Sequence, residues 1–288
     1  MSLEAVVMAV TDDRPRVLTV RSGQGRLLPS GPLLVEDDRT LELGMRRLID
    51  EQTGLDVGYV EQLYTFGDLT RDRQRRPGEP RTLGIAYLVL TREEETTGEW
   101  IDVYDLMPWE DRRTDPGATP VEEAIRAWAG TDPDRAERTQ IAFGAAGNQW
   151  DPVRALDRYE LLYEARLVEE WFADRDTSIP EEVVPGAAMA RDHRRVVATA
   201  VSRLRGKLTY RPVVFEMLPE TFTLSQLQRT VEALAGRRLH TQNFRRLVER
   251  GGLVEGTGTH TGTGGRPAEL FRFRREVVVE RPRPGLVG

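Results

Sequence analysis

The chain contains no cysteine, and this absence removes three chemistries at once. Disulfide bonds, thiolate metal sites and cysteine nucleophiles all require a thiol. Only three histidines occur among the 288 residues, so a histidine-rich metal site is excluded as well. Any function of the protein therefore has to rest on other side chains.

Long apolar segments are also missing. A membrane-spanning helix needs about 20 apolar residues in succession, and no part of the sequence approaches that length. The N-terminus lacks a basic segment followed by an apolar one, so no signal peptide is expected. Hydrophobic residues still make up 39% of the chain, which is enough to fill packed cores. We expect a cytoplasmic protein with no membrane partner, long enough for two domains of ordinary size.

Acidic and basic residues are unevenly distributed along the chain. Residues 190–288 hold 19 Arg and Lys against 9 Asp and Glu, a net charge of +10. Residues 1–189 hold the other 22 basic and 38 acidic residues, a net charge of −16. A basic module joined to an acidic one indicates a polyanionic partner for the basic part. The alternative is that arginine-rich surfaces are common in proteins from high-GC genomes.

Residues 190–288 contain the clearest helical patterns. Asp192 is placed to cap a helix, and a short extended stretch is expected at Val213–Met217. Thr223 and Gln226 have the spacing of a capping box, which predicts a further helix ending at Gly236.

Thr241 can cap a second short helix that ends at Gly251-Gly252. Its apolar positions would turn its polar side chains outward. Two short helices joined by a tight turn are typical of a helix-turn-helix. Arg side chains pair with guanine edges, and Asn or Gln with adenine edges.

The sequence also predicts a wing after this helix. Strands are expected at Leu253–Glu255 and Ala268–Phe273, with a loop of Gly and Thr between them that carries Arg266. Such an Arg can enter a minor groove or pair with phosphate. The alternative is a wing that mediates protein contacts only. The candidate DNA-contacting residues are Thr241, Gln242, Asn243, Arg245, Arg246, Arg250, Arg266, Arg205 and Lys207.

The N-terminal part alternates strands with a helix. A helix capped by Thr40 and closed by Gly54 is expected over Thr40–Thr53. Strands are expected at Glu4–Val10, Arg16–Arg21, Gly58–Phe66 and Thr82–Leu90. This order predicts an α/β sandwich, joined to a C-terminal α+β winged helix-turn-helix domain.

The segment Arg47–Leu55 resembles the Nudix box, whose glutamates converge on a divalent metal that holds a diphosphate. The positions that match the pattern are Arg47, Glu51, Gly54 and Leu55. Leu48 and Gln52 occupy the positions of the other two glutamates, so Glu51 is the one remaining carboxylate. Magnesium needs several charged oxygens. We therefore expect no metal site and impaired hydrolysis.

The two halves together resemble the Nudix-related transcriptional regulators of NAD metabolism, the NrtR-like proteins. Three stretches carry the resemblance: Tyr64–Asp72, Arg203–Leu227, and Asn243–Arg246 with Gly265–Phe273. An alphaproteobacterial NadQ-type subgroup is the nearest match within the family. The resemblance implies a homodimer that binds double-stranded operator DNA and represses genes of NAD biosynthesis or salvage. It also implies a nucleotide effector, ADP-ribose, NAD or ATP, and no required cofactor.

The resemblance places the effector in the former substrate cleft. Arg71 and Arg81 would neutralise phosphates, Phe66 or Tyr87 would stack on a base, and Asp68 would complete the site. The alternative is that the two aromatic residues belong to the core and that Arg71 is a solvated loop charge.

We expect a Nudix-like sensor over residues 1–110, a helical extension over 111–189 and the winged helix over 190–288. Helices at Val121–Gly130 and Asp151–Phe172 would form the extension and pack on the sandwich or make dimer contacts. Two other functions stay open at this point. One is an active ADP-ribose hydrolase with an accessory winged helix, and the other is an interaction module without a DNA partner.

Overall fold

The computed structural model describes residues 1–276 except 24, 69–70, 72–77, 79, 115–118, 145–148, 181–185 and 263–266. Within these residues seven strands form one sheet in the order β3-β2-β1-β6-β5, with β4 paired to β1 and β7 to β2. The strands are β1 (Ser2–Thr11), β2 (Arg14–Ser22), β3 (Gly25–Leu27), β4 (Ser30–Pro32), β5 (Tyr59–Phe66), β6 (Gly84–Leu90) and β7 (Glu99–Asp102). β1 and β6 run parallel, and the other pairs are antiparallel.

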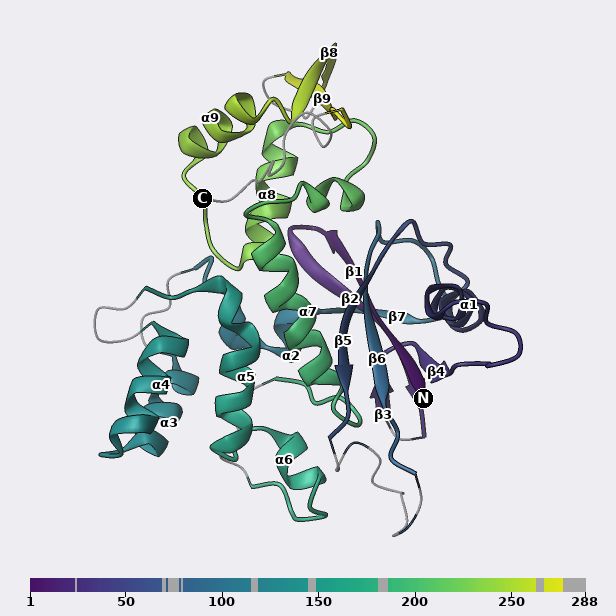
Figure 1. Ribbon diagram of the computed structural model, residues 1–288. Coiled ribbons are helices and arrows are strands. Elements are labelled where there is room, and N and C mark those ends of the chain that lie inside the picture. The colour runs from purple at the N-terminus through teal and green to yellow at the C-terminus, as the bar shows by residue number, and fades with distance from the viewer. Residues whose placement is uncertain are drawn as a thin grey trace.

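Helices cover both faces of this sheet (Figure 1). The central strand β1 is buried on both sides, which explains its nearly continuous apolar sequence. Leu3 and Val7 face the core under α1 (Leu41–Thr53), whereas Val6 and Met8 face the core under α7 (His193–Lys207). The predicted α/β sandwich is confirmed.

Helix α1 begins and ends where the sequence predicts. The Thr40 hydroxyl accepts a hydrogen bond from the Leu43 N–H at 3.1 Å. Gly54, at φ 73°, closes the helix in the left-handed conformation that favours glycine. Met45 and Ile49 are fully buried against the sheet.

The segment after the sheet is helical, but one prediction there is wrong. The expected single helix over Asp151–Phe172 is divided into a short 3-10 turn, α5 (Ala155–Glu164) and α6 (Glu169–Ala173). Arg166, at φ 60°, lies in the left-handed region and reverses the chain between α5 and α6. The helix expected from Val121 is α3 (Pro120–Ala129).

Further elements of the N-terminal 189 residues lay outside the predictions. They include the short strands β3, β4 and β7, the short helix α2 (Val103–Leu106) that follows β7, and the helix α4 (Pro133–Phe143), which is capped by Asp132 and packs beside α3. Each of these elements is short or weakly amphipathic, so tertiary packing rather than local pattern determines it.

The C-terminal part has the predicted winged-helix order, with corrections at the element ends. α8 (Leu224–Ala235) has the expected capping box between Thr223 and Gln226. The N-cap position of α9 (Thr241–Gly251) is His240, one residue before the expected Thr241, and its side chain makes no capping hydrogen bond. Residues Val213–Met217 form the 3-10 helix η4, where an extended stretch was expected.

The wing is longer than expected. β8 (Val254–Thr261) pairs with β9 (Ala268–Phe273), so glycines assigned to the loop lie within a strand. Phe222 bridges Phe271 through two backbone hydrogen bonds, which adds a third strand position to this small sheet.

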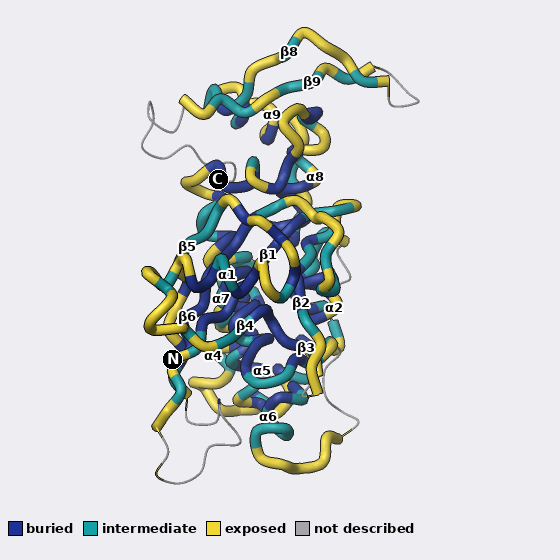
Figure 2. The backbone as a smooth tube through the Cα atoms, turned by 90° about the vertical axis from the view of Figure 1, so that its right-hand side faces the viewer, coloured by how far each residue is buried: buried dark blue, intermediate teal, exposed yellow. Residues whose placement is uncertain are grey.

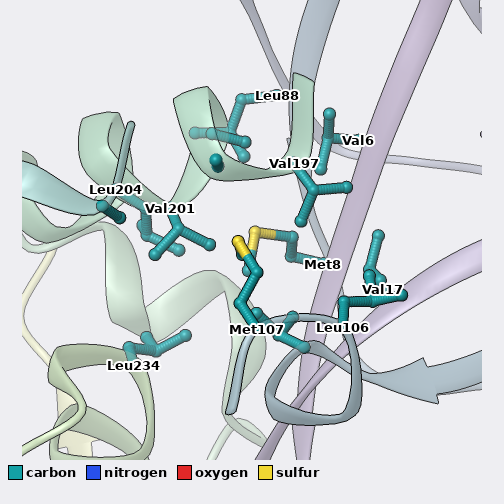
Figure 3. Close-up of a cluster of buried hydrophobic side chains, with 14 of the residues drawn as sticks. Val6, Met8, Val17, Leu88, Leu106, Met107, Val197, Val201, Leu204 and Leu234 are labelled. Atoms are coloured by element: carbon teal, nitrogen blue, oxygen red, sulfur yellow. The ribbon is translucent and has the colours of Figure 1, made fainter. Parts of the chain in front are cut away.

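One apolar core joins the sheet to the winged helix through α7. Met8 of β1, Val197 and Val201 of α7, and Leu234 of α8 belong to the same cluster of buried side chains (Figure 3). Met107, between β7 and α3, fills the space among them. Because the cluster is continuous, the sheet and the winged helix should unfold together.

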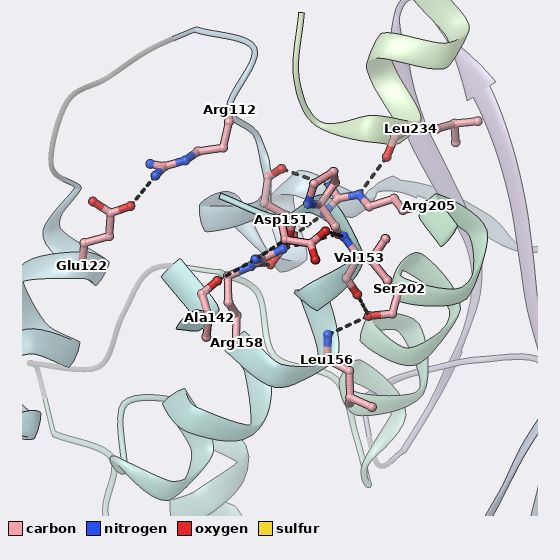
Figure 4. Close-up of polar contacts among 12 residues, drawn as sticks. Arg112, Glu122, Ala142, Asp151, Val153, Leu156, Arg158, Ser202, Arg205 and Leu234 are labelled. Carbon is pink, nitrogen blue, oxygen red and sulfur yellow. Dashed lines mark hydrogen bonds and ion pairs between the residues drawn. The ribbon is translucent and has the colours of Figure 1, made fainter. Parts of the chain in front are cut away.

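A buried carboxylate fastens the helical segment to α7. Glu110 is fully buried and binds Arg158 of α5 at 2.6 and 2.8 Å. The same carboxylate pairs with Arg205 of α7, whose Nε donates to the Leu234 carbonyl at 2.9 Å (Figure 4). Burial favours the neutral acid, but the two guanidinium groups hold the pKa of Glu110 below its ordinary value.

We predict that Glu110→Gln lowers the free energy of unfolding by about 3–5 kcal/mol, because two buried guanidinium groups lose their counter-charge. Urea denaturation measures this change. The matched control is Glu164→Gln, which removes an exposed carboxylate that pairs with Arg138 and should cost less than about 1 kcal/mol. Equal losses in the two variants would contradict the role of Glu110.

Candidate nucleic-acid interface and ligand cavity

Helix α9 turns a polar face to solvent. Phe244 and Val248 are buried, whereas Gln242, Asn243, Arg245 and Arg246 are exposed. None of the ion pairs found within the described residues involves Arg245 or Arg246. Arg250 is exposed at the last turn of the same helix. α9 thus presents amide and guanidinium groups together, the groups that recognise base edges and phosphates.

The wing lies beside this face. β8 and β9 extend at the end of the molecule, and much of their length is exposed (Figure 2). Thr241 is the first residue of α9, and its hydroxyl accepts from Gln228 Nε2 at 3.3 Å. Arg266, the predicted wing arginine, lies outside the described residues.

Two of the predicted DNA contacts are elsewhere. Arg205 is 3% exposed and is enclosed by Glu110 and Leu234. Lys207 pairs with Glu61 of β5 and lies near the Tyr59 hydroxyl. Both side chains join α7 to the N-terminal part. The prediction that they contact DNA is therefore wrong, and they form internal ion pairs instead.

The same finding revises the meaning of the charge asymmetry. Several basic residues beyond position 190 pair with carboxylates of the acidic part. These pairs are Arg194–Glu170, Arg195–Glu160, Arg205–Glu110, Lys207–Glu61 and Arg229–Asp13. Part of the +10 charge is therefore neutralised within the chain, whereas Arg245 and Arg246 of α9 stay exposed and lie outside the ion pairs of the described residues.

The side chains of the segment Arg47–Leu55, which resembles the Nudix box in sequence, make structural contacts. Leu48 is 4% exposed and belongs to the core between α1 and the sheet. The Gln52 amide donates to the Ser30 carbonyl at 2.8 Å and accepts from the Ser30 N–H at 3.1 Å. A carboxylate cannot make the first of these bonds, because it has no proton to donate. Gln52 therefore fastens α1 to β4.

A divalent metal does not fit this site. Glu51 is paired with Arg47 at 2.9 Å, and Arg47 also forms a bidentate pair with Asp38. These contacts lower the pKa of Asp38 to about 2, the Arg47 hydrogen bond having the largest effect. No group of three or more His, Asp or Glu suited to a metal ion occurs in the described part of the chain.

The five predicted effector residues are not gathered in one place. Phe66 and Tyr87 are both buried, but Phe66 faces the core under α7 and Tyr87 the core under α1. Asp68 is exposed and pairs with Arg195, and Arg81 is exposed. The two aromatic side chains therefore cannot stack on one base. Both are core residues, as the alternative interpretation of the sequence expects.

Arg71 alone of this set lines a cavity. The cavity has a volume of about 630 Å³ and lies between one end of the sheet, α6 and the segment that precedes α7. Its charged lining residues are Glu4, Arg26, Arg71, Glu169, Glu170 and Arg191. The residues missed by sequence reasoning come from β1, β3, α6 and residues 188–191. No local pattern unites such distant segments.

Charged groups are concentrated at one wall of the cavity. Arg71 is 6% exposed and bonds both Glu4 and Asp192, the latter through Nη1 at 3.0 Å. Burial raises the pKa of Glu4 and of Asp192, and the charge of Arg71 opposes that effect. His193 is fully buried beside them, and its Nδ1 accepts from the Leu28 N–H at 2.8 Å, so Nε2 carries the proton.

Comparisons with known proteins identify the C-terminal winged helix and the overall fold. Residues 214–273 match the model of the NrtR DNA-binding winged helix domain. The ADPR responsive transcriptional repressor NtrR of Acinetobacter baylyi is 36% identical over 85 residues, which are 30% of this chain and 34% of that protein. The alignment thus spans about a third of the length of this curated relative.

Two solved structures share the fold along nearly the whole chain. NrtR of Shewanella oneidensis, crystallised with a 27mer DNA, aligns with a TM-score of 0.57 and 22% identity over 97% of this chain and 95% of that one. A MutT/nudix family protein of Enterococcus faecalis aligns with a TM-score of 0.55 and 14% identity over 95% and 85%. At these identities the likeness establishes the fold alone.

The class of protein is therefore a Nudix-like α/β domain joined to a C-terminal winged helix. More particularly, the winged helix is of the NrtR DNA-binding type, and the chain as a whole has the NrtR fold. The resemblance to NrtR-like proteins drawn from the sequence is confirmed. No helix within the described residues is both long and apolar enough to cross a bilayer.

We predict that Gln52→Glu lowers the free energy of unfolding by about 1–3 kcal/mol, because the Ser30 carbonyl loses its donor and faces a carboxylate. It should not produce measurable magnesium binding in calorimetric titration, since Arg47 neutralises Glu51 and Leu48 supplies no ligand. The control is Gln62→Glu, an exposed position on β5 that should change stability by less than about 0.5 kcal/mol. Magnesium binding by the Gln52 variant would contradict the structural role.

We also predict that His193 makes the fold sensitive to mild acid. Burial, reinforced by Arg71, lowers the pKa of His193 to about 3, whereas an unfolded His titrates near 6.5. The folded state requires the neutral ring, so stability is complete above about pH 6.5 and falls as the pH drops towards 3. Between pH 7 and 5.5 the wild type should lose about 1 kcal/mol more than His193→Asn, which keeps an acceptor for Leu28.

Urea denaturation across that pH range measures the difference. Glu4 and Asp192 act in the opposite direction because their pKa values are raised, but both carboxyl groups are present in the wild type and in His193→Asn, so the comparison isolates the histidine. Parallel pH profiles for the wild type and His193→Asn would exclude His193 as the source.

Proposed function

We propose that this protein is a transcriptional repressor of NAD biosynthesis or salvage genes. The observation that carries the proposal is the polar face of α9, which exposes Gln242, Asn243, Arg245 and Arg246 on a winged helix of the NrtR DNA-binding type. In a helix-turn-helix the second helix enters the major groove, and such side chains read base edges there. Arg250 and Arg266 would add phosphate contacts, and Thr241 would lie where α9 enters the groove.

The effector would occupy the cavity between the sheet and α6. Its volume of about 630 Å³ lies within the range of small-molecule sites, roughly 300–1,000 Å³. Arg26, Arg71 and Arg191 line it and suit a phosphorylated ligand. Among ADP-ribose, NAD and ATP we favour ADP-ribose, because the Acinetobacter relative is named as ADPR responsive.

The proposed organisation keeps a sensor at 1–110, a helical extension at 111–189 and a DNA-binding part at 190–288. α7 belongs to the last part by sequence, but its buried arginines attach it to the other two. Two-fold symmetric operators are read by two-fold symmetric proteins, so we expect a homodimer.

A non-catalytic role follows from the same contacts. Leu48 is buried, Gln52 bonds Ser30, and Glu51 is neutralised by Arg47, so the site lacks the carboxylates that assemble a hydrolytic metal. The competing function is an ADP-ribose hydrolase with an accessory winged helix. Incubation with Mg²⁺ and ADP-ribose decides between them, because turnover near 1 per second or faster would establish the enzyme.

DNA binding is tested directly with a duplex that carries the promoter of the protein's own gene. A gel shift at micromolar protein that weakens as salt increases supports the repressor. No shift under those conditions would favour an interaction module. Addition of ADP-ribose to the shifted complex then tests the effector.

We predict that Arg245→Ala and Arg246→Ala each weaken promoter binding by about 5- to 150-fold, the range expected for loss of a specific arginine contact. ADP-ribose binding should be unchanged, because α9 lies at the opposite end of the molecule from α6, which lines the cavity (Figure 1). Fluorescence anisotropy with labelled duplex measures the first effect and calorimetry the second. The control is Arg21→Ala, an exposed arginine on β2, and equal weakening by this variant would indicate a merely general charge effect.

A further inference from the structure

Helix α7 connects the cavity with the winged helix. The segment 188–191 forms part of the cavity wall and leads directly into α7. α7 has 15 residues and so spans about 22 Å. Its far end is fixed to α8 by the Arg205 hydrogen bond to the Leu234 carbonyl. α7 thus joins the cavity wall to the DNA-binding part.

The start of α7 is held by a side chain of the cavity. Asp192 occupies the N-cap position, but its carboxylate makes no capping hydrogen bond to the helix. It bonds Arg71 Nη1 at 3.0 Å instead, and its second oxygen has no partner within the described residues. Arg71 reaches the cavity wall from the other side. Asp192 thus depends on a guanidinium group that a ligand can also reach, whereas the next residues of the same turn are held by the His193–Leu28 hydrogen bond and the Arg194–Glu170 ion pair.

The backbone at this point is suited to movement. Arg191 has φ 57°, in the left-handed region that is unfavourable for a residue with a side chain. It lies in the cavity wall immediately before Asp192. A conformation of this kind persists only when surrounding contacts impose it, and the Arg71–Asp192 ion pair lies at the next residue of the chain.

We propose that an anionic ligand in the cavity competes with Asp192 for Arg71 and so releases the first turn of α7, which makes Asp192 the residue that couples the cavity to the winged helix. The proposal rests on the proposed function, since it explains how an effector in that cavity changes DNA affinity. A phosphate attracts Arg71 and repels the Asp192 and Glu4 carboxylates. Release of α7 spreads the winged helix over more orientations, so DNA binds less tightly.

The decisive variant is Asp192→Asn, which removes the charge while keeping the shape and breaks no helix cap. The affinity for fluorescent promoter duplex is measured with and without saturating ADP-ribose. In the wild type we expect ADP-ribose to weaken DNA binding by about 5- to 150-fold, a common range for allosteric coupling. In Asp192→Asn the factor should fall to twofold or less, while ADP-ribose binds at least as tightly as in the wild type.

The control is Glu160→Gln, which removes the partner of Arg195 on α7 without touching the cavity and should retain the wild-type factor. A full wild-type factor in Asp192→Asn, or ADP-ribose binding weakened more than tenfold, would overturn the role of Asp192 and leave the repressor standing. If wild-type protein binds no promoter DNA or no ADP-ribose, or binds both without coupling, the proposed function fails and the coupling fails with it.

A second measurement avoids any dependence on how Asp192→Asn folds. In wild-type protein, saturating ADP-ribose should increase hydrogen exchange at the amides of residues 196–199, whose acceptors lie in the first turn of α7, and leave those of α5 unchanged. Unchanged or slower exchange at 196–199 with the ligand bound would also overturn the proposal.

Discussion

The architecture depends on the burial of arginine side chains along α7. Arg194 and Arg205 are almost inaccessible, and a guanidinium group is not neutralised by deprotonation, so each needs a carboxylate beside it. Glu170 and Glu110 supply these charges from the helical segment. The sheet, the extension and the winged helix are consequently arranged around one helix, and the apolar core between them is continuous.

Local pattern was sufficient for much of the fold. The capping residues of α1 and α8 and the left-handed glycines after them place those helices to within a residue. Prediction failed where a distant contact decides the conformation. The turn at Arg166 divides an apolar pattern that by itself would continue as helix, and Val213–Met217 begins with two β-branched valines yet forms a 3-10 turn against the core.

The candidate sites were predictable to unequal degrees. Helical periodicity alone separates the exposed polar residues of α9 from the buried Phe244 and Val248. The cavity depends on segments as far apart as β1 and residues 188–191, and sequence reasoning identified only Arg71 among its lining. Charge counting misjudged Arg205 and Lys207, because net charge does not reveal which basic residues are consumed by internal pairing.

The continuous core has a consequence for how such proteins can be recombined. A winged helix joined through a flexible linker can be exchanged between sensors at the linker. Here a junction near residue 190 would transplant α7 with Arg194 and Arg205 but leave Glu170 and Glu110 behind. A chimeric sensor built from this chain must therefore carry residues 110–170 together with its DNA-binding part. The alternative is to keep both parts of the chain and to exchange only the side chains that face the winged helix.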